Sequence, residues 1–126
     1  MEQSVLLVSG DEKQCEEICG ILESEPYHSV TLHSLEKLEQ ALQSRTRGVI
    51  ILDLDNVPVN NQLIRNLKKR HQQFTILGVS SLPFHPDLNE AVSTHIFACL
   101  GKPVDGDELL FWLNAASGVT TKNSPG

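Results

Sequence analysis

Short, unbroken apolar runs alternate with longer stretches of helical periodicity along this chain of 126 residues. The runs are Val5–Val8, a weaker Val30–Leu32, Val49–Leu52, Thr75–Val79 and Ile96–Leu100. Continuous aliphatic and β-branched runs of this length are typical of strands that are buried on both faces. The pattern therefore indicates a parallel sheet that is covered by helices.

The segments between the runs carry apolar residues at helical spacing. Asp11 is a favourable N-cap for the first of them, and the basic run Lys68–His71 suits the C-terminus of the third. The fourth segment is short and poorly marked. The predicted apolar faces are Cys15, Ile18, Cys19, Ile21 and Leu22; Leu35, Leu38, Ala41 and Leu42; Leu63, Ile64 and Leu67; Leu88, Ala91 and Val92; and Leu109, Leu110, Trp112, Leu113 and Ala116.

Five strand-then-helix units in one chain require parallel strands joined by right-handed crossovers. We therefore predict an α/β fold with a doubly wound, five-stranded parallel sheet of the flavodoxin-like kind and helices on both faces. Gly118 is expected to end the last helix, so residues 1–118 form one domain. The polar residues 119–126 are expected to be a flexible tail or the start of a linker.

Composition narrows the classes of partner. Ten Lys and Arg against sixteen Asp and Glu give a formal net charge of −6, which argues against direct nucleic-acid binding and against an anionic membrane surface. No segment approaches the roughly 20 apolar residues that would span a bilayer. The three cysteines are an odd number, and no secretory signal is evident, so we expect a cytoplasmic protein with reduced thiols.

Polar residues follow the apolar runs at the points where strands should end. These segments are Ser9–Asp11, Asp53–Asp55, Ser80–Ser81 and Gly101–Pro103. Because ligands of open α/β sheets bind at the carboxyl ends of the strands, these side chains are expected to converge on one rim. A carboxylate beside an ammonium and a hydroxyl can accept a phosphoryl group, since the two donors hold its oxygens.

On these residues the chain resembles the receiver domain of two-component response regulators over essentially its whole length to Gly118. The segment that ends in Asp53 resembles the phosphoacceptor segment of that family, and the Ser80 and Lys102–Pro103 segments resemble its two other motifs. The resemblance implies that Asp53 is the phosphoacceptor, Ser80 the switch hydroxyl and Lys102 the phosphate-contacting lysine, with a cis peptide at Lys102–Pro103. It also implies Mg²⁺ as a cofactor, a sensor histidine kinase or phosphotransfer protein as donor, and an output domain or protein. The output would read the face formed by the fourth helix, fifth strand and fifth helix.

The sequence also departs from that family. Ser9 and Gly10 stand where two consecutive acidic residues normally hold Mg²⁺, which weakens the predicted metal site because Mg²⁺ usually takes one or two carboxylates. The predicted metal ligands are then Asp53, the main-chain carbonyl of Asp55 and, if the loop is shifted, Asp11 or its neighbour. Cys99 stands at the aromatic switch position. The loop after Asp53 is altered as well, with Pro58 five positions on and Asn61 in the place of a glycine.

Two hypotheses of function follow. In the first, the chain is a receiver that takes a phosphoryl group on Asp53, and phosphoacceptor chemistry is then its only catalytic role. In the alternative, it is a pseudo-receiver kept as a protein-interaction or dimerisation module without phosphotransfer. A flavodoxin-like cofactor domain is a third possibility, although no glycine-rich phosphate motif surrounds Gly10. Cys15 and Cys19 are predicted to be small core residues rather than metal ligands.

Overall fold

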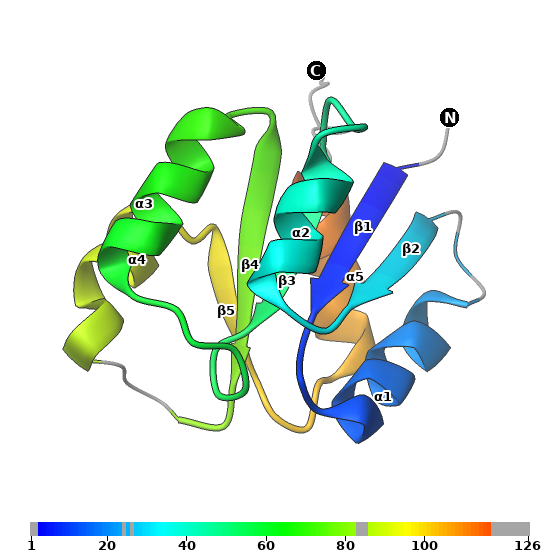
Figure 1. Ribbon diagram of the computed structural model, residues 1–126. Helices are drawn as coiled ribbons and strands as arrows, with labels where there is room; N and C mark the ends of the chain where they lie inside the picture. Colours follow the sequence, from blue (N-terminus) through cyan, green and yellow to red (C-terminus); the bar gives the residue numbers. More distant parts are fainter. Residues whose placement is uncertain (1–2, 24, 26, 83–85, 117–126) are drawn as a thin grey trace, which may run out of the picture.

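The computed structural model describes residues 3–23, 25, 27–82 and 86–116 (Figure 1). The strands are β1 (Gln3–Val8), β2 (Tyr27–Leu32), β3 (Gly48–Asp53), β4 (Phe74–Ser80) and β5 (Ala98–Gly101). The helices are α1 (Glu12–Leu22), α2 (Leu35–Leu42), α3 (Asn61–Arg70), α4 (Asn89–Thr94) and α5 (Gly106–Ala116), with a short 3-10 helix at Pro86–Leu88. The predicted helix end at Gly118 and the tail 119–126 lie outside the described residues.

The five strands form one sheet in the order β2-β1-β3-β4-β5, and every neighbouring pair is parallel. The order confirms the predicted doubly wound sheet, since each strand returns to the same direction through a helix. It reverses between β1 and β3, the place where open α/β sheets bind ligands. β2 and β5 are the two edge strands.

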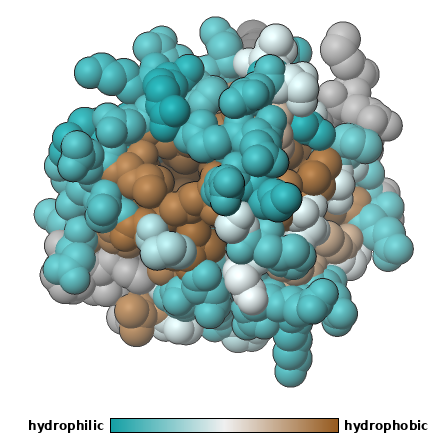
Figure 2. Space-filling view, in the orientation of Figure 1, coloured by the Kyte–Doolittle hydropathy of each residue, from teal (hydrophilic) through white to brown (hydrophobic). Residues whose placement is uncertain are grey.

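Two apolar layers hold the helices on the sheet. On one face α1 and α5 pack against β1, β3 and β4 through residues such as Ile18, Leu77 and Leu113. On the other face α2, α3 and α4 pack through residues such as Leu38, Ile64 and Ala91. The outer surface over this second layer is largely hydrophilic, with apolar side chains showing between its helices (Figure 2).

Local sequence explains where the helices begin. Asp11, Ser34 and Asn60 have extended backbones and accept hydrogen bonds from the first free N–H groups of α1, α2 and α3. The last turn of α3 is basic, which suits the negative end of the helix dipole. None of the helices in the described part of the chain combines the length and the apolar character needed to cross a membrane.

Candidate functional site

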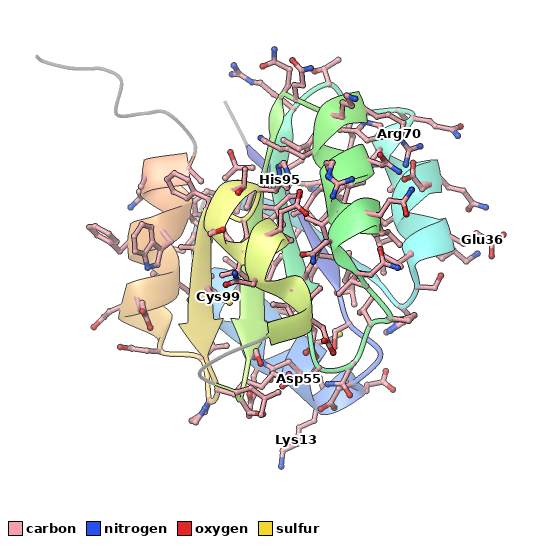
Figure 3. All side chains as sticks on the ribbon, turned by 90° about the vertical axis from the view of Figure 1, so that its left-hand side faces the viewer. Lys13, Glu36, Asp55, Arg70, His95 and Cys99 are labelled. Atoms are coloured by element: carbon pink, nitrogen blue, oxygen red, sulfur yellow. The ribbon has the colours of Figure 1, made fainter. Side chains whose placement is uncertain are left out.

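The residues predicted to share one rim do lie together at the carboxyl end of the sheet. Asp53 is the last residue of β3 and Ser80 the last of β4, while Ser9 follows β1 and Lys102 follows β5. Figure 3 shows Asp55 at the end of the molecule toward which β4 and β5 point, with Lys13 at the same end and Arg70 toward the opposite end. Because Ser9 follows β1 and Asp53 ends β3, the site lies where the strand order reverses.

Asp53 is a buried carboxylate whose two oxygens are both held by protein donors. Oδ1 accepts from Lys102 Nζ at 2.8 Å and from the backbone N–H of Asp55 at 3.2 Å. Oδ2 accepts from Ser9 Oγ at 2.7 Å and from Asn56 Nδ2 at 2.9 Å. Burial alone would raise the pKa of Asp53, but the hydrogen bonds from Lys102, Ser9 and Asn56 outweigh it and lower the pKa.

Asp55 uses its side chain as well as its backbone at this site. Its Oδ1 accepts from Ser80 Oγ at 2.7 Å, and its Oδ2 accepts from the backbone N–H of Ser81 at 2.8 Å and from Ser81 Oγ at 3.0 Å. Burial would raise the pKa of Asp55, yet these hydrogen bonds and Lys102 lower it far more. Asp55 therefore ties the end of β4 to the loop after β3.

Lys102 bridges the two carboxylates. Its Nζ lies 2.8 Å from Asp53 Oδ1 and 3.1 Å from Asp55 Oδ2, and its side chain is only 15% exposed. Partial burial would lower the pKa of Lys102, but the hydrogen bonds to both carboxylates raise it. The predicted cis peptide at Lys102–Pro103 is present. Two carboxylates and one ammonium leave the cluster with a net charge of −1.

The segment after β1 presents a hydroxyl to Asp53. Ser9 is buried and also accepts from the backbone N–H of Asp11 at 3.0 Å. Asp11 itself caps α1, since its Oδ1 accepts from the N–H groups of Lys13 and Gln14. A side chain at Gly10 would place its Cβ 3.0 Å from the carbonyl oxygen of Asn56, so the loop after β3 closes against this position.

These donors do not make the acidic Mg²⁺ site that the resemblance implies. Mg²⁺ takes near-octahedral oxygen ligands, usually including one or two carboxylates. The oxygens of Asp53 already accept from an ammonium, an amide and a hydroxyl, and Asp11 is engaged at the helix terminus. Among the described residues, no group of three or more His, Cys, Asp or Glu side chains is placed to hold a metal ion.

Cys99 and Asn61 are the two positions, at the switch and after the acceptor loop, where this chain departs from the residues of the family that it resembles. Cys99 pairs with Gly78 in the register of β4 and β5, and its Sγ lies 3.1 Å from where a Cβ on Gly78 would stand. A thiol therefore lies beside β4 where the resemblance implies an aromatic ring. Asn61 begins α3 and bonds to α4, accepting from the N–H of Ala91 at 2.8 Å.

Sequence reasoning placed Ser9 and Ser81 on the rim but gave neither a role as a donor, and it did not name Asn56. All three donate to Asp53 or Asp55. The signal available was their position, since each follows the carboxyl end of a strand and carries a short polar side chain.

No family model matches the sequence, and no curated protein matches it. Solved structures do match. The signal receiver domain of an HD domain-containing protein from Pseudomonas fluorescens Pf-5 superposes with a TM-score of 0.84 at 21% identity, covering 98% of this chain and 100% of that one. The fold is that of a receiver domain. A two-component response regulator from Clostridium difficile gives a TM-score of 0.80 at 16% identity, covering 96% and 99% of the two chains.

A third structure with the receiver fold is an atypical orphan response regulator, described as revealing a phosphorylation-independent regulatory mechanism. It matches with a TM-score of 0.73 at 20% identity, covering 90% of this chain and 94% of that one. At these identities the likeness is one of fold, so function is argued from the residues of the site.

Proposed function

We propose that this chain is a signalling domain with the receiver fold that binds a partner protein without being phosphorylated. The observation that carries the proposal is the hydrogen bond from Ser9 Oγ to Asp53 Oδ2, at 2.7 Å. A neutral hydroxyl stands where the resemblance calls for an acid, and it holds the carboxylate that would have to attack.

The charge of the cluster supports the same proposal. Transfer of a phosphoryl group replaces the single charge of the Asp53 carboxylate with about two negative charges on the acyl phosphate, so it adds about one negative charge to a buried cluster that already carries a net charge of −1. Lys102 contacts Asp53, but it is shared with Asp55 and offers only one positive charge. The cluster is therefore better suited to keep its side chains in one hydrogen-bonded arrangement than to accept further negative charge.

A second candidate function keeps the phosphoacceptor role. It is favoured by the placement of Lys102, 2.8 Å from Asp53, and of Ser80 on the same rim. In that case Asp53 would attack the phosphohistidine of a sensor histidine kinase or phosphotransfer protein, and Lys102 and Ser80 would hydrogen-bond the phosphoryl oxygens.

One experiment separates the two. The full chain is incubated with acetyl phosphate and Mg²⁺ and examined by intact mass spectrometry, beside the Asp53→Asn variant and a receiver of known phosphoacceptor activity. We expect no adduct on this chain while the control receiver gains one phosphoryl group. An adduct that disappears in Asp53→Asn establishes the second candidate and overturns the first.

Exposed aromatic side chains support an interaction role. Phe97 is 49% exposed and Phe111 62% exposed, and both make edge contacts with Trp112, at centroid distances of 5.7 and 5.1 Å. Exposed aromatic clusters are favourable binding surfaces for other proteins. The partner would be an output protein or a second copy of the chain, acting in the cytoplasm, and the phosphorylation-independent orphan regulator is a precedent on the same fold.

A further inference from the structure

β2 is an edge strand with an open side. It pairs with β1 along all six of its residues, and no strand of the described residues lies on its other side (Figure 1). Edge strands usually carry lysine, proline or a bulge that discourages further pairing. The sequence of β2, Tyr-His-Ser-Val-Thr-Leu, contains neither lysine nor proline.

A groove of about 550 Å³ runs between α1 and the beginning of β2. Its β2 wall is formed by residues 27–29, and its α1 wall includes Glu16, Cys19, Gly20 and Glu23. Nothing lies within 4 Å of the position where a Cβ on Gly20 would stand, so the helix leaves the groove open at that point. Cys19 is half-buried there, with its Sγ 3.3 Å from Thr31 Oγ1.

The α1 wall is acidic. Glu16 and Glu23 are exposed, and neither is in an ion pair with a residue that the structure describes. Seven residues of helix separate them by about 10 Å along the axis. Lysines two or four positions apart on an extended segment lie about 7 or 13 Å apart, within reach of both carboxylates.

We infer that this groove binds an extended, basic segment of another protein, which adds as a sixth strand beside β2. Main-chain hydrogen bonds to the free side of β2 would supply the pairing, and the two glutamates would select lysine or arginine. A second copy of this chain is a poorer occupant, because it would bring the same two carboxylates against each other. The inference does not depend on whether Asp53 is phosphorylated.

The test measures how fast iodoacetamide alkylates each cysteine of the full chain, localised by fragmentation mass spectrometry. The probe is a capped hexapeptide of alternating lysine and valine. At ten times its Kd the probe should slow alkylation of Cys19 about tenfold, because only about one site in eleven stays free. Cys99 is exposed on β5, at the other edge of the sheet, and should keep its rate.

Two further peptides decide between strand addition and simple charge attraction. The same hexapeptide with glutamate for lysine should give no protection. A lysine–valine peptide that is N-methylated on alternate amides keeps its charge but loses strand donors, and it should also fail. Equal protection by either peptide overturns the inference, and so does an absence of protection by the original probe.

Variants on α1 supply matched controls. Glu16→Lys should weaken the binding of the probe peptide about tenfold, because it reverses a charge close to the peptide. Glu17→Lys makes the same change one residue along the helix, on a different surface groove, and should have little effect. Gly20→Leu, at a position where a Cβ meets nothing within 4 Å, puts a side chain into the groove and should abolish protection while the fold is kept. If Cys19 is instead protected by raising the chain's own concentration, the occupant is a second copy and the inference is overturned.

Discussion

At the scale of single residues, the two carboxylates of the site are neutralised in part and hydrogen-bonded by other groups of the same chain. Asp53 takes four hydrogen bonds and Asp55 takes three from the end of β4, and Lys102 joins the two carboxylates. A buried charge is tolerated only where donors or an opposite charge compensate it. The ammonium of Lys102 supplies that compensation from within the chain.

Removal of the ammonium should therefore destabilise the fold. We expect Lys102→Met to lower the free energy of unfolding by about 3 kcal/mol, because it leaves Asp53 buried without its cation. The double variant with Asp53→Asn should recover much of the loss. Urea titration followed by circular dichroism measures both, with Lys13→Met, an exposed lysine of α1, as the control. Equal stability of Lys102→Met and Lys13→Met would contradict this account.

We expect Ser9 to decide whether the chain responds to Mg²⁺. Millimolar Mg²⁺ should not change the melting temperature of the wild-type chain. Ser9→Asp places a second carboxylate beside Asp53, which should destabilise the chain without metal and let Mg²⁺ at ten times its Kd restore about 1.4 kcal/mol. Ser9→Asn, which is of similar size but uncharged, is the control in a thermal-shift assay. A Mg²⁺-dependent rise in the wild-type chain would show that the protein donors leave room for the ion.

The sequence was sufficient to place Asp53, Ser80 and Lys102 on one rim, because the carboxyl ends of parallel strands meet there. It could not show which donors each carboxylate uses. The hydroxyl of Ser80, for instance, donates to Asp55, a pairing that the strand pattern does not indicate. Side-chain rotamers and loop geometry decide such pairings, and neither is encoded in spacing along the chain.

At the scale of elements, the predicted alternation of strands and helices is confirmed, and the least regular part is α4 and β5. The apolar run was predicted to form a strand from Ile96, but β5 begins at Ala98. The N–H of Ile96 donates to the carbonyl of Ala91, within α4, so this backbone group bonds to the helix and not to the sheet. An apolar run gives no signal of which backbone groups a preceding helix will use.

α4 depends on α3 for its N-terminal cap. It has six residues and no side-chain cap of its own, and Asn61 of α3 accepts from Ala91 N while donating to the carbonyl of Asp87. We expect Asn61→Ala to cost about 1 kcal/mol and to speed amide exchange in α4 more than in α1. Asn66→Ala, an exposed position on the same helix, is the control. Uniform acceleration over both helices would mean that Asn61 supports the whole fold rather than α4.

At the scale of the whole molecule, the carboxylate cluster joins distant parts of the chain. Ser9, Asp53 and Lys102 follow or end three different strands. The cluster lies at the carboxyl end of the sheet, where the strand order reverses between β1 and β3. The protonation state of these few groups should therefore be visible in the stability of the entire fold.

Stability should fall at both extremes of pH. Folding lowers the pKa values of Asp53 and Asp55. Below their ordinary value of 3.8 the unfolded chain therefore binds protons that the folded chain does not bind, and the free energy of unfolding falls. Each group adds a slope of up to about 1.4 kcal/mol per pH unit there. The pKa of Lys102 is raised, so its contribution is complete below 10.5 and is lost as the pH rises through the higher folded value.

Urea titrations from pH 2 to 12 should show a plateau between these limbs. Asp53→Asn should flatten the acid limb, and Asp107→Asn, an exposed residue of α5, should leave it unchanged; an acid limb of wild-type slope in Asp53→Asn would assign the loss to carboxylates elsewhere in the chain.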